Sequence, residues 1–406
     1  GDRSRFDLIT LTAEEDAAGV DALKLDFDLT VEAFASYLQH LSEPGLLAVE
    51  GGTRVPPRLA LRLLQTARDA LLRSGFEHPD RHVAMIRGWQ RFVILVSKAP
   101  LTDADESAIR RFSTSLGFDL VWLPHMQAAE ANRFQVLNEP YFHRAAAALF
   151  DTSPGRQPPP AHYRLQVADD DRPFPLLFTR WSEWWAAIAS GDQRALSRLD
   201  AGLLIGTLTL ALAGSASLVL ILLPLWLLRR ALPASASPGP RFPALQLFLG
   251  HPVYATTAVL SAFLIFAGLG SLWSQRRAER RVAATLRLAV ATILFFSLVY
   301  LLFLPDWLEH LAGLPVLGRI MVVFLLLAPL AFAMGIPFST GLRRLGDSAS
   351  QLVPWAWGIN GCASVISAAG APLLAAEIGF SGLMMAAAAA YLLLPFIRLE
   401  RSPGRA

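Results

Sequence analysis

The stretch AFAMGIPFSTGLRRLGDSASQLVPWAWGINGCASVISAAGAPLL, residues 331–374, decides the architecture. It holds the end of one apolar segment, a short loop with two arginines, and the start of a second apolar segment. The second segment carries Asn360, Ser364 and Ser367 at spacings that place them on one helical face. Small and polar residues let membrane helices approach closely, because lipid supplies no hydrophobic drive between helices. The sequence therefore predicts a bundle of membrane helices packed around residues 355–378.

The composition of the 406-residue chain is that of a membrane protein. It is 53% hydrophobic and 17% charged, with a mean hydropathy of +0.41, whereas soluble proteins carry roughly 25% charged residues. Nearly all acidic residues precede Asp200, which predicts a soluble part followed by a membrane part. The net charge of +3 comes mainly from arginines that flank apolar segments. This indicates membrane topology and a lipid bilayer as partner, and no nucleic-acid partner.

The membrane part contains apolar stretches of about 20 residues, the length that crosses a bilayer. Six crossings would place both ends of the chain on the same side, and the arginine-rich loops predict that this side is the cytoplasm. The last two spans adjoin at a tight turn, Glu377–Gly379. The predicted spans are Ala201–Leu228, Leu245–Trp273, Leu286–Leu304, Ile320–Phe338, Trp355–Ile378 and Phe380–Ile397.

The soluble part alternates predicted strands with amphipathic helices. This alternation predicts an α/β layer with a largely parallel sheet and one antiparallel hairpin. We expect strands at 5–12, 46–50, 82–89, 91–98 and 118–123, a turn at Glu43–Gly45, and helices that start after Thr30, Pro57 and Thr102. The predicted divisions are an α/β domain at 1–150, a linker and membrane-entry segment at 151–200, the bundle at 201–397 and a tail at 398–406.

Several strings resemble one family. FDLI, TVEAFASYLQHLSEPGLLAV and the hairpin HVAMIRGW/RFVILVSKAP are similar to the second half of a class I S-adenosylmethionine-dependent methyltransferase or spermidine synthase fold. EANRFQVLNEPYF, FLGHPVYA, MGIPFSTGL and above all PWAWGINGCASV look like bacterial spermidine-synthase-like integral membrane proteins. The resemblance implies a Rossmann-like domain, a partial methyltransferase-type sheet, followed by about six transmembrane helices. It further implies a multi-pass protein of the bacterial inner membrane, with S-adenosylmethionine or its decarboxylated form as cofactor and a small amine as substrate.

The resemblance also assigns candidate site residues. Glu14, Glu15 and Asp16 follow the first strand, where spermidine synthases carry the aspartate that helps to deprotonate the amine; the alternative is a solvated loop. The family's glycine-rich cofactor turn and its acidic partner are not found ahead of Arg5, so this chain is expected not to bind the nucleoside unaided.

Other candidate residues follow the last strand or lie in the membrane part. Glu130, Asn132 and Arg133 stand in a stretch that recurs in the family and are interpreted as a substrate-side lid. The single Cys362 and the scattered histidines predict no metal site.

Two functional hypotheses follow. The first is a membrane-anchored, spermidine-synthase-like transferase, either a methyltransferase or an aminopropyltransferase. The second is a non-catalytic transport or scaffold protein whose Rossmann domain is a degenerate sensor. In the second hypothesis Asn360, Ser364 and Ser367 line a polar path, although they could equally be hydrogen-bonding contacts between helices. The predicted spans carry no charged residue at their centre, which disfavours an ion or proton pump.

Overall fold

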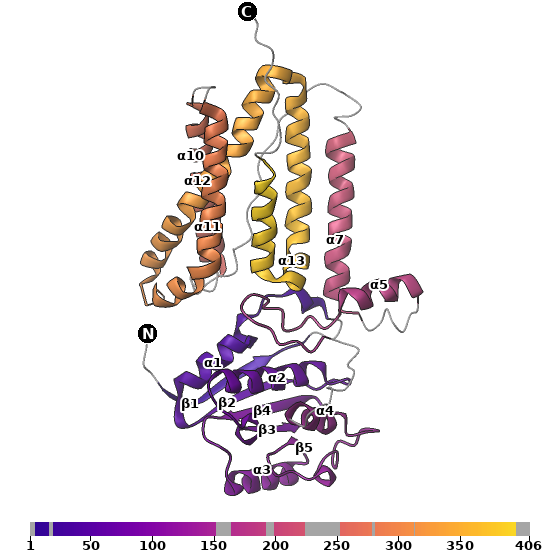
Figure 1. Cartoon of the computed structure of the whole chain (residues 1–406). Coiled ribbons are helices and arrows are strands. Elements are labelled where there is room, and N and C mark those ends of the chain that lie inside the picture. The colour runs from indigo at the N-terminus through magenta and orange to yellow at the C-terminus, as the bar shows by residue number, and fades with distance from the viewer. Residues whose placement is uncertain are drawn as a thin grey trace, which may run out of the picture. The chain divides into compact units, whose positions relative to one another are not determined.

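The computed structural model describes residues 5–15, 19–151, 164–191, 199–223, 252–277, 281–311 and 313–394. The chain divides into two compact units, which we call the sheet unit (Asp2–Ile205) and the helical unit (Gly206–Ala406). Figure 1 draws the sheet unit in indigo to magenta and most of the helical unit in orange to yellow.

The sheet unit is built on five strands. Their order is β1-β2-β4-β3-β5, and β1 and β2 pair in parallel whereas the other three pairings are antiparallel. The α/β class and the β3–β4 hairpin are confirmed, but the expectation of a largely parallel sheet is wrong. The hairpin places β4 against β2, and β5 then runs antiparallel to β3. The strands are β1 Phe6–Ala13, β2 Leu41–Gly52, β3 Val83–Arg87, β4 Arg91–Ser97 and β5 Asp119–Trp122.

Helices α1, α2 and α3 begin where the sequence predicts. The Thr30 hydroxyl accepts from the backbone N–H of Ala33, and Thr102 forms a capping box with Asp105. The turn expected at Glu43–Gly45 is instead part of the longer strand β2, beside a register shift in its pairing with β1. The helices are α1 Val31–His40, α2 Arg58–Arg73, α3 Asp103–Leu116, α4 Tyr141–Phe150 and α5 Trp181–Ser190, with short 3-10 turns at Val20–Leu23, Phe27–Leu29, Pro79–His82 and Ala128–Glu130.

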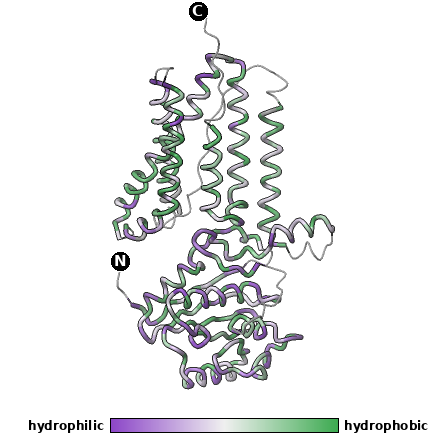
Figure 2. The backbone as a smooth tube through the Cα atoms, viewed as in Figure 1, coloured by the Kyte–Doolittle hydropathy of each residue, from purple (hydrophilic) through white to green (hydrophobic). Residues whose placement is uncertain are grey.

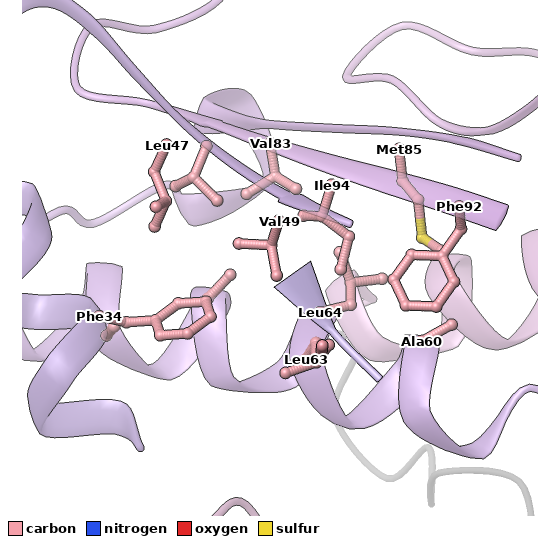
Figure 3. Packing of buried hydrophobic residues seen from close by; sticks show 14 of the residues in the cluster. Phe34, Leu47, Val49, Ala60, Leu63, Leu64, Val83, Met85, Phe92 and Ile94 are labelled. Atoms are coloured by element: carbon pink, nitrogen blue, oxygen red, sulfur yellow. The ribbon is translucent and has the colours of Figure 1, made fainter. Parts of the chain in front are cut away.

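The main core of the sheet unit lies between the sheet and helices α1, α2 and α4. Alternate strand residues such as Val49 and Ile94 point toward Phe34 and Leu63 on the helices, as Figure 3 shows. Their neighbours on the other face of the sheet pack in a smaller cluster with α3. Phe178, which falls in the range assigned to a linker, is fully buried in the main core. The described residues between 164 and 180 therefore belong to the packed sheet unit.

The helical unit supplies long apolar helices, which are mostly green in Figure 2. Among the described residues, five helices are long and apolar enough to cross a membrane. The prediction was about six, and the count differs because the last two predicted spans form one element, α13. The helices are α7 Ala201–Ser217 (whose first turn belongs to the sheet unit) with a π-helical turn at Leu218–Leu222, α10 Pro252–Gln275, α11 Val282–Leu311, α12 Val316–Ala349 and α13 Val353–Leu392.

The expected turn at Glu377–Gly379 is present inside α13. Gly379 has φ 77° and ψ 169°, so the helical path breaks there, and Figure 1 shows α13 turning back on itself. Only glycine adopts this backbone conformation without strain.

Replacing Gly379 with alanine should therefore lower the stability of the helical unit by about 1–3 kcal/mol, because a Cβ is strained at this φ and ψ. Thermal unfolding in detergent measures the change. Gly361→Ala is the matched control, since its added Cβ would meet only Ile221 at 3.8 Å. Equal melting temperatures for the two variants would show that the turn does not depend on glycine.

The two arginines expected in a loop lie within helix α12, which continues to Ala349. A 3-10 turn at Ser350–Leu352 makes the connection to α13 instead. One of these arginines, Arg343, donates to the carbonyl of Gln275 at 2.8 Å and to that of Arg277 at 3.2 Å. It therefore caps the C-terminal end of α10, where backbone carbonyls have no helical partner.

Helices α10 and α12 are in unusually close backbone contact. A Cβ added at Gly270 would lie 2.9 Å from the carbonyl carbon of Phe332, and one at Gly335 would lie 2.7 Å from that of Ala267. In α13, a Cβ added at Gly361 or Gly370 would have only ordinary contacts, at 3.8 Å and 3.7 Å. Gly270 and Gly335 thus mark a closer helix contact, between α10 and α12, than Gly361 and Gly370 do within residues 355–378, where the sequence predicted the packing centre.

Candidate functional site

The carboxyl ends of β1 and β2 meet at one edge of the sheet, which is where α/β folds place their ligands. Glu14 and Glu50 share the guanidinium of Arg91, at 3.8 Å and 3.0 Å. The Thr12 hydroxyl also donates to Glu50, at 3.3 Å. Glu14 is 79% exposed, and an ionised carboxylate has about four acceptor positions. This outer layer can therefore accept hydrogen bonds from an ammonium group.

A buried inner layer lies behind it. Glu15 accepts from the guanidinium of Arg58 at 2.7 Å, and its side chain is 2% exposed. Arg58 also pairs with Asp200 at 3.0 Å, and the Asp200 side chain is fully buried. The second carboxylate oxygen of Glu15 is buried and has no hydrogen-bond partner among the described residues. Asp16, the third candidate of this loop, lies outside the described residues.

The geometry separates the two glutamates that the sequence analysis grouped together. Glu14 is open to solvent, whereas Glu15 is enclosed and held by a cation. A base that deprotonates a substrate must reach the proton that it removes. Exposure therefore favours Glu14 for contact with a substrate, and the buried ion pair of Glu15 suits an anchoring role.

Asp200 immediately precedes α7 and contacts several groups of the inner layer. One of its oxygens accepts from the backbone N–H groups of Phe178 and Thr179, each at 2.8 Å, and from the Thr179 hydroxyl at 3.0 Å. The backbone N–H of Gly202 donates to the carbonyl of Gly19 at 2.8 Å. A Cβ at Gly202 would lie 3.0 Å from that same oxygen, so only glycine fits there. The loop after β1 is thus bound to the first turn of α7.

Arg62 lies one turn after Arg58 on α2 and extends this network. The residue is 1% exposed. Its guanidinium donates hydrogen bonds to the carbonyls of Pro175, Phe174 and Arg164. Burial lowers the pKa of Arg62 to about 9, which leaves it charged at neutral pH. Arg62 therefore fixes the segment that leads to Thr179 against α2. Sequence reasoning missed Arg58, Arg62 and Asp200.

The predicted lid residues lie together after β5 and hold a loop in place. Asn132 has a positive φ of 57° and exchanges hydrogen bonds of 2.8 Å with the backbone of Leu137. The buried carboxylate of Asp119 accepts from the backbone N–H of Arg133 at 2.6 Å. Glu130 pairs with Arg110 at 2.7 Å. These contacts stabilise the loop; the side chain of Arg133 is exposed.

A small pocket lies beside this loop. Its polar lining includes Arg87, Asn132, Tyr141 and His143. Arg87 is buried beside Asp119, with 2.8 Å between guanidinium and carboxylate, and burial lowers the pKa of Arg87. The empty volume of about 180 Å³ is below the roughly 300–1,000 Å³ of pockets that enclose drug-sized ligands. A nucleoside does not fit in this pocket.

One group of possible metal ligands comes together although the sequence spacing did not predict it. Donor atoms of Asp103, Glu106 and His125 lie within 4.8 Å of one another. Both carboxylate oxygens of Glu106 are already engaged, one by Arg110 at 3.0 Å and the other by His125 at 2.8 Å. Because both oxygens of this buried carboxylate are engaged, we interpret this cluster as an ion-pair network.

The predicted polar face of α13 divides in two. Ser367 is exposed, whereas the amide nitrogen of Asn360 and the hydroxyl of Ser364 are buried and have no hydrogen-bond partner in the described parts of the chain. The neighbouring Cys362 thiol lies 3.3 Å from the carbonyl of Ser217, at the start of the π-helical turn. These serine and asparagine groups thus form no continuous hydrogen-bonded row along the helix.

Comparisons with known proteins leave the family open. No protein-family model matches the chain, and neither a curated protein nor a solved structure matches it. The fold and the five apolar helices are consistent with a multi-pass membrane protein that carries a mixed α/β domain.

Proposed function

We propose that this protein is a membrane-anchored, spermidine-synthase-like transferase that acts on a small amine with S-adenosylmethionine or its decarboxylated form. The observation that supports this most is the outer layer at the carboxyl ends of β1 and β2. Its exposed Glu14 and its partner Glu50 are bridged by Arg91. Carboxylates at this edge of a parallel pair suit an ammonium ligand, through charge-assisted hydrogen bonds.

The proposed division of labour follows from exposure and charge. The cofactor would supply an electrophilic carbon attached to a sulfonium. Glu14 and Glu50 bind and orient the amine, and Glu14 can take up its proton because its carboxylate is open to solvent. The described residues at this edge provide no glycine-rich turn at a helix N-terminus, since Pro57 precedes α2. The described residues at this edge therefore do not by themselves form a nucleoside site.

A second candidate is a non-catalytic scaffold or transport protein whose α/β domain senses a ligand. The buried inner layer favours it, because Glu15 pairs with Arg58 and Arg58 pairs with Asp200, at the start of the first apolar span. A ligand that disturbs this loop would then act directly on the start of α7.

Calorimetry on the full-length protein in lipid nanodiscs separates the two candidates. We expect S-adenosylmethionine or its decarboxylated form to bind, and putrescine to bind about tenfold more weakly after Glu14→Gln with Glu50→Gln, because charge-assisted hydrogen bonds are lost. Glu43→Gln is the control, as Glu43 is 78% exposed near the opposite end of β2. If neither nucleoside binds, the transferase function is excluded and the scaffold function remains.

A further inference from the structure

Helix α5 presents an apolar stripe to solvent. Trp185 is 61% exposed and Ile188 is 43% exposed, whereas Trp184 and Ala187 are buried. Trp181, four residues before Trp185, lies on the same side as the two exposed residues by helical spacing. The stripe is thus a second apolar face of α5, which the packing of the sheet unit does not use.

The stripe lies at the level where the chain enters the first apolar span. The backbone N–H of Thr179 donates to Asp200 at 2.8 Å, and α5 starts two residues after Thr179. Asp200 directly precedes the span Ala201–Ile221. The starts of α5 and α7 are therefore held together by the same hydrogen bonds.

Figure 1 shows α5 leading away from the first turn of α7. A helix that starts where the chain enters the membrane and leads away from the first turn of the span remains near the bilayer surface. Its polar side bears Glu183 and Ser190, which can face water.

The composition of the stripe points to lipid. Tryptophan is enriched where a protein meets the headgroup region, because its ring is apolar and its N–H needs a polar partner. We propose that α5 is an interfacial helix that inserts Trp181, Trp185 and Ile188 at the boundary between lipid headgroups and acyl chains. The first span is then flanked by a surface anchor of the sheet unit. This inference is independent of the proposed transferase activity.

Site-directed fluorescence tests the proposal in vesicles of phosphatidylcholine and phosphatidylglycerol. Cys362, the only cysteine, is first replaced by serine, and a single cysteine is introduced as Trp185→Cys, Ile188→Cys or, as control, Ala186→Cys. Ala186 is exposed and lies on the polar side of the same helix. Each cysteine is labelled with an environment-sensitive dye. The fluorescence of the dye is then quenched either by a lipid with a nitroxide on its headgroup or by aqueous iodide.

We expect the lipid nitroxide to quench the dye at positions 185 and 188 at least about threefold more than at 186, with the reverse order for iodide. Two labelled positions on the stripe keep the test valid if one variant is unstable. Equal quenching by the lipid nitroxide at 185, 186 and 188, or stronger iodide quenching at 185 and 188, would overturn the proposal.

Discussion

Replacing Gly335 with alanine should separate helices α10 and α12 and destabilise the helical unit more than any other single methyl group added there. The new Cβ would lie 2.7 Å from the carbonyl carbon of Ala267 and closer still to its oxygen. Both obstacles are backbone atoms, which cannot rotate away as a flexible side chain can. Gly270→Ala should act in the same way, because its Cβ would overlap the carbonyl of Phe332. We expect a cost of about 3 kcal/mol, the upper end of the usual range for overpacking.

Disulfide formation between the two helices measures this effect directly. The hydroxyls of Ser274 and Ser339 are 2.8 Å apart, so cysteines at these positions should cross-link readily when Gly335 is present. Gly335→Ala should slow the cross-link and lower the melting temperature in detergent. Gly341→Ala on the same helix is the control, since its Cβ would meet nothing within 4 Å. Undiminished cross-linking in Gly335→Ala would refute the close contact.

Replacing Asp200 with asparagine should loosen the connection between the loop after β1 and the first turn of α7. Both carboxylate oxygens of Asp200 face donors, with Arg58 on one side and the N–H groups of Phe178 and Thr179 on the other. An asparagine must turn its NH₂ group toward one of these sets, where neither the guanidinium nor the two backbone N–H groups can accept a hydrogen bond. Breaking a buried ion pair costs about 3–5 kcal/mol.

Hydrogen exchange in nanodiscs reports this change at the amides of Phe178 and Thr179. A loss of about 3 kcal/mol corresponds to roughly a hundredfold faster exchange. Glu32→Gln serves as the comparison, because the pair of Glu32 with Arg73 is substantially exposed and should contribute at most about 1 kcal/mol. Similar exchange rates for the two variants would mean that Asp200 has no special role.

Local patterns in the sequence were sufficient for much of the sheet unit. Alternating apolar residues gave the strands, and the capping threonines Thr30 and Thr102 gave the starts of α1 and α3. The direction of β5 could not be predicted from the sequence, because it depends on how the β3–β4 hairpin joins the sheet. The turn at Gly379 could be predicted from the sequence, since an acidic residue and a glycine interrupt a long apolar run.

The site and the helix packing depend on tertiary contacts that no local pattern encodes. Arg58 and Asp200 are 142 residues apart, and a lone arginine after two prolines reads as a surface residue. Gly268 and Gly270 look alike in the sequence, yet only Gly270 faces the backbone of α12. The acidic loop after β1 was recognised, but its division into an exposed Glu14 and a buried Glu15 required the structure.

A buried ion-pair network holds the first turn of α7 to the carboxyl edge of the sheet. A double-mutant cycle with Arg58→Met and Asp200→Asn tests it most directly, using the hydrogen-exchange free energy of the Thr179 amide. A direct buried interaction predicts a coupling energy of about 1.5 kcal/mol or more between the two substitutions. Additive effects, within about 0.5 kcal/mol, would contradict the claim.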